Sequence, residues 1–139
     1  MSAITTIALL PVLSVVLLTT LELGSLRVVA ARARSAADVA ALVAVNDQDD
    51  AELARSGRLV PAADAVDVAR AVFTENLEPI AGLLAATPEA IAASASIRVD
   101  LSPATVRISA TVPVRTSFFG ALFFRPITDV AIAANGGAR

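Results

Sequence analysis

The hydrophobic pattern divides the N-terminal segment, residues 1–45, into two halves. Residues 1–21 contain no ionisable side chain and come close to the roughly 20 apolar residues that cross the hydrocarbon core of a bilayer. After Glu22, arginine and aspartate alternate with alanine and valine, as they do in a helix with one apolar side. No residue at the join disfavours a helix more strongly than Gly24. The pattern predicts one long helix, apolar in its first half and amphipathic in its second.

Small residues dominate the apolar side of the second half. At helical spacing the sequence places Leu26, Val29, Ala30, Ala33, Ala37, Ala40 and Ala44. Because small side chains let helix backbones approach closely, this stripe predicts tight packing of helix on helix. A second line, formed by Val28, Val39 and Leu42, widens the apolar surface. Two surfaces of the helix therefore need cover, one from the chain's own domain and one from a neighbouring subunit.

Two residues of the apolar half stand out. Pro11 removes one helical hydrogen bond, which is tolerated in lipid where neighbouring helices or hydroxyl groups take up the freed carbonyl. The available hydroxyls belong to Thr5, Thr6, Ser14, Thr19 and Thr20. Pro11 is interpreted either as a mild kink without a role or as a local softening of the helix. Glu22 has Leu26 at position i+4, so its own helix offers no basic partner there. Glu22 either lies among the lipid headgroups or pairs with a neighbouring subunit.

The middle of the chain, residues 46–95, is expected to be a helical connector. Asp49 or Asp50 caps a short helix that Gly57 ends, and further helices are predicted from about residue 60 to 77, over 79–86 and over 88–94. The acidic residues between 47 and 52 are also candidate calcium ligands. They lack the glycine and the glutamate that an EF-hand loop requires, so a capped, solvated turn is favoured.

From residue 96 the hydrophobic period changes from 3.6 to 2. Alternation over 96–101, 105–115 and 129–134 predicts three strands of an antiparallel meander with one dry and one wet face. Residues 135–139 are expected to be a flexible tail. The loop between the second and third strands holds Phe118, Phe119, Phe123 and Phe124. It is interpreted either as a loop tucked onto the sheet or helix, or as an exposed contact patch for a neighbouring subunit or the membrane surface.

Composition narrows the function classes. The chain is 56% hydrophobic with a net charge of −2, which argues against a nucleic-acid partner. Cys, His, Trp and Tyr are absent and all eleven basic residues are arginine, so thiolate, imidazole and Schiff-base chemistry are excluded. Glu75 and Glu78 have the spacing of an acid pair but are favoured as solvated charges. No enzyme, metal or cofactor is predicted. The fold class is α+β, in three regions: 1–45, 46–95 and 96–139.

Several motifs resemble a known family. A polar start leads to Pro11 in an Ala-Leu-Leu-Pro-Val-Leu segment, Leu-Glu-Leu-Gly follows at 21–24, and Ser-Ala-Ala-Asp-Val-Ala-Ala-Leu at 35–42. Together with the closing segment 106–122, these resemble the TadE/TadG family of pilin-like proteins of the tight-adherence pilus. Members usually carry a basic leader ahead of a cleavage site and a glutamate shortly before the proline. Thr5 stands at that glutamate position and no leader precedes Met1 here, so this is either a processed form or a member processed differently.

The resemblance implies a structural, pilin-like subunit of a type IV or Tad-type pilus or of its assembly complex. Such a subunit waits as a single-pass protein in the bacterial cytoplasmic membrane and then moves to the cell surface. The implied partners are membrane lipid, other copies or related pilins, a membrane platform with its ATPase, and a prepilin peptidase. The alternative is a secreted or anchored binding module in which residues 1–31 are a signal peptide or permanent anchor.

Overall fold

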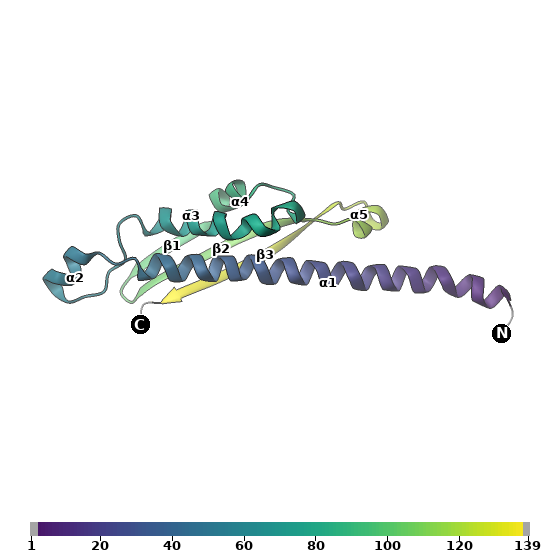
Figure 1. Cartoon of the computed structure of the whole chain (residues 1–139), viewed down its shortest axis with the longest axis horizontal. Coiled ribbons are helices and arrows are strands. Elements are labelled where there is room, and N and C mark those ends of the chain that lie inside the picture. The colour runs from purple at the N-terminus through teal and green to yellow at the C-terminus, as the bar shows by residue number, and fades with distance from the viewer. Residues whose placement is uncertain (1–2, 138–139) are drawn as a thin grey trace.

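The computed structural model describes residues 3–137, with side chains from residue 9 onward. Its architecture is a long helix carrying a small α+β domain on its C-terminal half (Figure 1). In chain order the elements are α1 (Ala3–Asn46), α2 (Asp50–Ser56), α3 (Ala65–Leu77), the 3₁₀ helix η1 (Glu78–Leu83), α4 (Pro88–Ser94), β1 (Ser96–Leu101), β2 (Ala104–Arg115), α5 (Phe118–Phe123) and β3 (Ile127–Gly137). The predicted fold class is confirmed.

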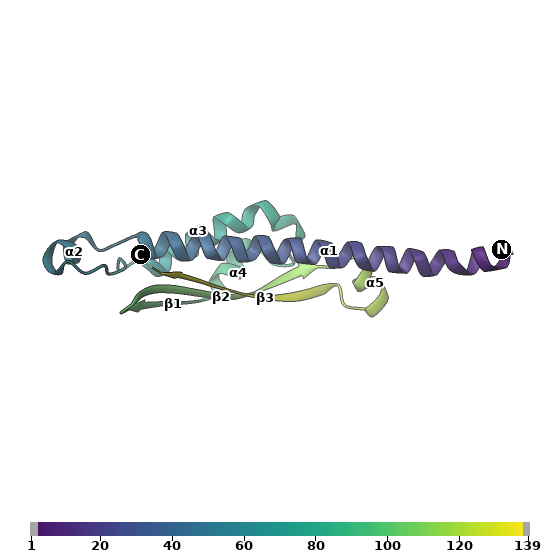
Figure 2. The same ribbon diagram turned by 90° about the horizontal axis from the view of Figure 1, so that it is seen from below.

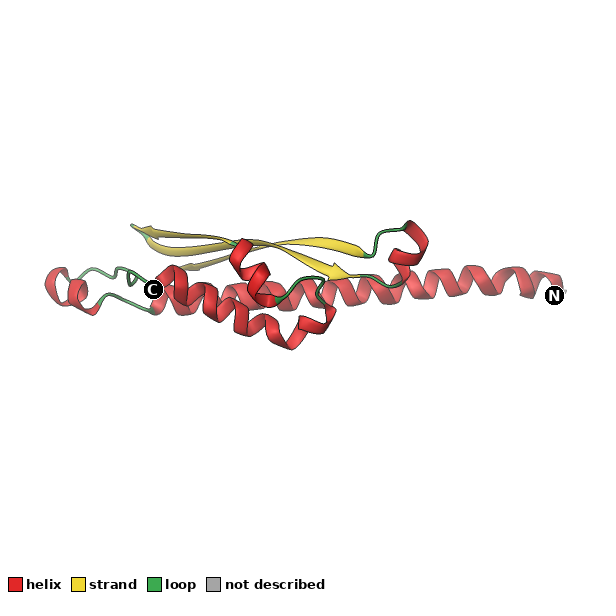
Figure 3. Ribbon diagram, turned by 90° about the horizontal axis from the view of Figure 1, so that it is seen from above, coloured by secondary structure: helices red, strands yellow, loops and turns green. Residues whose placement is uncertain are grey.

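The domain has two layers. The strands form one antiparallel sheet in the order β1-β2-β3, and α1, α3 and α4 pack on one of its faces, as Figures 2 and 3 show. The inward residues of β2 alternate with outward ones and are buried, which is the period expected of a half-covered strand. The hydrophobic core lies between α1, α3 and β2, while the other face of the sheet is open.

The helix α3 packs on the rest of the domain through one buried face. Ala65, Ala69, Phe73 and Leu77 recur every fourth residue and are buried, so they form one face of the helix. Complete burial of a side chain such as Phe73 contributes about 1.5–3 kcal/mol. This face of α3 packs against the small residues of the α1 stripe and against the sheet.

The sheet approaches α1 most closely at the end of β3. A methyl group added to Gly136 would lie 2.6 Å from the carbonyl oxygen of Ala41 and 2.7 Å from its carbonyl carbon. Both distances are too short for a real contact, so this position has room only for a residue without a side chain. Close approach of another backbone is one reason for a glycine in a strand. Alanine on α1 and glycine on β3 therefore let the two backbones meet almost directly.

Some of the predicted boundaries were wrong. β3 extends from Ile127 to Gly137, so residues 135–137 are strand and not flexible tail, while 138 and 139 lie outside the described residues. Pairing with the start of β2 accounts for this, since Gly137 is opposite Thr105. Residues 118–123 form the short helix α5 where a loop was predicted. The helix predicted over 79–86 is the 3₁₀ helix η1, and the one predicted from residue 60 begins at Ala65.

The predicted caps of the short helices are confirmed. The Asp49 carboxylate accepts hydrogen bonds from the amides of Ala51 and Glu52, both at 3.0 Å, and Gly57 ends α2 with a φ of 67°. Thr87 caps α4, because its hydroxyl oxygen accepts a hydrogen bond from the amide of Ala90. These are the ordinary means of satisfying free amides and carbonyls at helix ends.

Candidate membrane-boundary site and assembly surface

The N-terminal half of α1 is uncovered by the rest of the chain. Within the described residues one helix is long and apolar enough to cross a membrane, and its most apolar stretch is not buried. The exposed apolar side chains of this half are Leu9, Leu10, Val12, Leu13, Val15, Val16, Leu17, Leu18, Leu21 and Leu23. From Ala3 to Leu21 the helix rises about 28 Å, which is close to the ~30 Å thickness of a bilayer core.

Pro11 lies inside α1, which continues through it without a break. The hydroxyls of Ser14, Thr19 and Thr20 donate to the carbonyls of Leu10, Val15 and Val16 at 2.7–2.9 Å. Each hydroxyl thus bonds four residues back along its own helix, as is usual for serine and threonine in apolar helices. Thr5 belongs to α1, but its side chain lies outside the described residues.

Glu22 ends the apolar stretch and is bound within its own chain. One carboxylate oxygen accepts hydrogen bonds from the amides of Ser117, at 2.6 Å, and Phe118, at 3.1 Å. The other oxygen accepts one from the amide of Phe119 at 2.6 Å. These amides open α5 and have no partner within that helix, so the carboxylate satisfies them and its charge suits the helix N-terminus. Glu22 thereby ties the tip of the β2–β3 hairpin to the end of the apolar half of α1.

The base of the same hairpin tip is closed by a second set of bonds. Thr116 donates its amide to the carbonyl of Pro126 and its hydroxyl to the carbonyl of Arg125, both at 2.9 Å. Thr116 is buried although it is polar, which is possible because its hydroxyl has a partner. Gly120 lies against Pro126, where an added methyl group would come within 3.1 Å of its α-carbon. The tip is therefore held at both ends.

The four phenylalanines of this tip divide into two groups. Phe118 and Phe119 are half-buried, and the ring centroid of Phe119 lies 6.2 Å from that of Phe118 and 5.9 Å from that of Phe123. Phe123 is 60% exposed and Phe124 is 90% exposed. One side of the tip is thus tucked in and the other faces outward, and whether the outward side contacts a subunit or the membrane stays a prediction.

The C-terminal half of α1 has one covered and one uncovered side. Ala33, Ala37 and Ala40 are wholly buried against the chain's own domain, so they already have a packing partner. Ala30 is half-buried, and Gly24 has open space where a side chain would stand. The predicted second line does not pack on the domain, because its members are exposed: Val28, Val39 and Leu42. This exposed stripe is the part of the amphipathic half that the chain leaves free.

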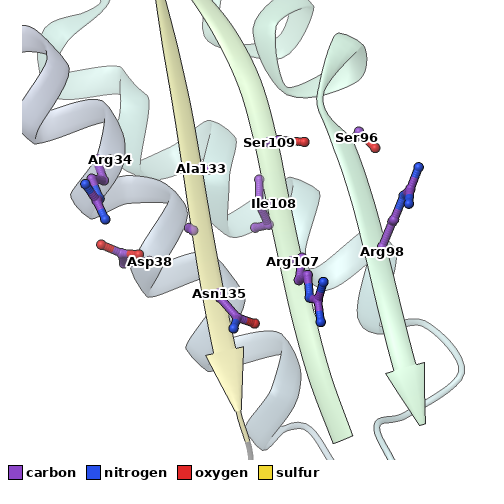
Figure 4. A pocket seen from close by; sticks show the side chains of 10 residues that line it. Arg34, Asp38, Ser96, Arg98, Arg107, Ile108, Ser109, Ala133 and Asn135 are labelled. Carbon is purple, nitrogen blue, oxygen red and sulfur yellow. The ribbon is translucent and has the colours of Figure 1, made fainter. Parts of the chain in front are cut away.

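A shallow groove of about 580 Å³ crosses the open face of the sheet. Figure 4 shows Arg34 and Asp38 on α1 at one side and Arg98 on β1 at the other, with Arg107 on β2 between them. Arg98 is directly opposite Arg107, and the Arg107 guanidinium lies 3.8 Å from the Asp100 carboxylate. Guanidinium groups bind carboxylate or phosphate groups. The lining contains no nucleophile–base pair of the kind that covalent catalysis uses.

The remaining candidate residues form no chemical site in the part of the chain that the structure describes. Glu75 and Glu78 are exposed. In residues 3–137 no group of three or more histidine, cysteine, aspartate or glutamate residues is arranged to hold a metal ion. In the acidic turn, the side chain of Asp49 caps α2. This agrees with the favoured interpretation of the segment as a capped turn.

The long helix α1 is the part of the chain that matches a known family. The family model described as "Putative Flp pilus-assembly TadE/G-like" matches residues 1–48, so the predicted resemblance to TadE/TadG-like proteins is confirmed over α1 and its end. No curated protein and no solved structure matches the chain. The family match and the exposed apolar helix together indicate a pilus-related, membrane-anchored subunit. The matched family is one of pilus assembly and not of enzymes.

Proposed function

We propose that the chain is a non-enzymatic structural subunit, major or minor, of a Tad-type pilus or of its assembly complex. The observation that carries the proposal is the match over residues 1–48. This segment contains α1 (Ala3–Asn46), whose described side chains are largely uncovered along its first half. Exposed leucine and valine side chains on a helix of this length are stable either in lipid or against other apolar helices. The subunit uses the first environment before assembly and the second afterwards.

In this proposal the subunit has different partners in the membrane and in the assembled state. Membrane lipid surrounds the apolar half while the subunit waits in the cytoplasmic membrane, and other copies or related pilins replace it in the assembled state. A membrane platform and its ATPase move the subunit, and a prepilin peptidase acts on the N-terminal region. The exposed stripe of Val28, Val39 and Leu42 is the assembly surface of the amphipathic half, because the alanine stripe is already covered.

Cross-linking tests the assembly surface, since the chain has no native cysteine. Leu42→Cys places a thiol on the exposed stripe, and Ala40→Cys is the matched control because Ala40 is wholly buried. With a short bifunctional maleimide, we expect dimers of the Leu42→Cys chain in sheared surface filaments or in membranes that hold the assembly complex. The control should remain monomeric. Assembled material that gives no dimer through Leu42→Cys, or equal dimers through both positions, would contradict the proposed surface.

For Glu22 we propose a second role in assembly, beside its bonds within the chain. Three amides occupy part of the acceptor capacity of the carboxylate, which has about four lone-pair positions. The remaining capacity suits the terminal amine or an arginine of an adjacent subunit. From Ala3, the first described residue of α1, to Glu22 the helix rises about 28 Å, so a neighbour whose N-terminal end reached Glu22 would be staggered by at least that length.

Two variants separate the assembly role of Glu22 from its role in holding the hairpin tip. Glu22→Gln removes the charge that a neighbour would need, whereas Ser117→Pro removes one amide donor and leaves the charge in place. If Glu22 binds a neighbour, Glu22→Gln should abolish filament yield with membrane insertion intact, and Ser117→Pro should retain assembly. Equal losses in both variants would assign Glu22 to the hairpin tip alone, and unchanged yield with Glu22→Gln would sink the assembly role.

A binding module with a cleaved signal peptide is the second candidate function, and the arginine-bordered groove is the observation that favours it. The continuity of α1 across Ala30 and Ala31 disfavours it, because Val29 is part of the domain core. Intact-mass measurement of the native protein distinguishes the two. A mature chain that retains residues 1–31 in membranes or filaments supports the subunit, whereas a soluble chain that begins near Arg32 supports the binding module.

A further inference from the structure

We propose that the hairpin tip, Leu122 to Arg125, is a second membrane contact that inserts into the lipid interface beside α1. The inference rests on the proposed membrane location of the apolar half of α1 and goes beyond it, because it assigns a lipid-binding surface to the domain itself. The occupant of this surface is the boundary between headgroups and acyl chains, and not a neighbouring protein.

The hairpin tip lies beside the end of the apolar half of α1. Glu22 accepts hydrogen bonds from the amides of residues 117–119, which fixes the start of α5 at the residue where the apolar half of α1 ends. Figure 1 shows α5 beside α1 at the end of the domain that faces the N-terminus. When residues 3–21 span the bilayer core, α5 lies at its edge. The exposed apolar residues of α5 therefore lie at the end of the domain from which the span extends.

The tip combines exposed apolar side chains with a cation. Leu122, Phe123 and Phe124 are adjacent and exposed, and Phe124 is the most exposed large apolar residue of those described. Phe124 has a φ of 54°, a conformation that is uncommon for a bulky residue. Arg125 follows at once and is exposed. A large apolar group beside a cation is the composition of interfacial anchors, in which the ring enters the acyl region and the charge remains with the phosphates.

The shape of the tip agrees with this chemistry. A shallow cavity of about 450 Å³ is lined by Phe119, Phe123, Arg125 and Thr128. Two of these residues are aromatic, one carries a guanidinium group and one carries a hydroxyl. This lining matches a lipid where the acyl chain meets the phosphate group. The tip is also held at its base and by Glu22, so little ordering is required for it to bind lipid.

Tryptophan fluorescence tests the proposal in the full chain, because the native sequence contains no tryptophan. Phe124→Trp makes the tip the sole indole of the chain. Leu101→Trp is the matched control, since Leu101 is 62% exposed and lies at the opposite end of the domain. Leu17→Trp reports the span. Each full-length variant is reconstituted in phosphatidylcholine and phosphatidylglycerol vesicles whose acyl chains are brominated near the headgroup or near the chain end.

We expect the emission of Phe124→Trp to be blue-shifted and quenched most by bromine near the headgroup. Leu17→Trp should be quenched most by deep bromine, and Leu101→Trp by neither. Quenching of Leu17→Trp without quenching of Phe124→Trp would overturn the lipid contact and leave the span intact. A blue shift of Phe124→Trp that bromine does not quench would also overturn it, and would assign the tip to a protein contact. Loss of quenching at Leu17→Trp would refute the membrane location on which both proposals rest.

Discussion

Substitution of Gly136 by alanine is the most direct test of how the sheet is joined to α1. The added methyl group would stand 2.6 Å from the oxygen and 2.7 Å from the carbon of the Ala41 carbonyl, and 3.0 Å from the amide nitrogen of Leu42. All three are backbone atoms of α1, so no rotation of a side chain can make room. An ordinary contact begins at 3.4 Å, and β3 would have to move away from the helix by roughly 0.8 Å.

This displacement has a cost that can be bounded. Overpacking of a close-packed interior costs about 1–3 kcal/mol, and each kilocalorie lowers the melting temperature of a small domain by about 4–8 °C. We therefore expect Gly136→Ala to lower the melting temperature by at least about 4 °C. The measurement is thermal unfolding of the full chain in one detergent, followed by far-ultraviolet circular dichroism.

Gly137→Ala is the matched control for this prediction. At the neighbouring position an added methyl group meets only the methyl of Thr105, at the ordinary distance of 3.8 Å. The control should melt within about 4 °C of the native chain, because substitutions without a special structural role change stability by about 0.5 kcal/mol or less. If Gly136→Ala melts with the control, the close backbone approach of β3 to α1 does not exist in the protein.

Two further substitutions test the covered side of α1 and the charge pattern of the open sheet face. Ala37→Leu forces extra volume between α1 and the domain and should lower the free energy of unfolding by about 1–3 kcal/mol, whereas Val39→Leu on the exposed stripe should leave it unchanged in urea titrations. Arg98→Glu converts the like-charged pair with Arg107 into an opposite pair and should stabilise the sheet by about 0.2–1 kcal/mol. That gain should shrink at high ionic strength, and an equal gain at low and high salt would contradict the electrostatic explanation.

The elements that the sequence predicted best are those whose signals are local. The apolar run and the helical rhythm beyond Glu22 predicted α1, and the capping residues Asp49 and Thr87 predicted where α2 and α4 begin. The two-residue alternation of 105–115 predicted β2 and its buried face. Each of these signals depends on neighbours within a few residues, so a single sequence contains them in full.

The features that the sequence did not predict depend on contacts between distant segments. Asn135, Gly136 and Gly137 have the composition of a loop, yet they form the end of β3 because they pair with β2. At Gly136, α1 leaves no room for a side chain. A glycine in a strand does indicate close backbone approach, and this was the available signal. The alanine stripe indicated tight packing, but alanine spacing is the same whether the partner is another subunit or the chain's own sheet.

The bonds of Glu22 connect the two halves of the protein in a way that neither half predicts alone. The same α1 that contributes Val29 and the buried alanines to the core also carries the exposed leucines of the first half, with no flexible joint between them. A domain joined by one continuous helix moves with that helix, and the tie from Glu22 to residues 117–119 adds a second connection at the membrane boundary. Together with the packing of α1 against α3, β2 and β3, this tie restricts movement of the hairpin tip relative to α1. In the proposed membrane location, the exposed stripe of the amphipathic half would thus be held at a fixed height and direction.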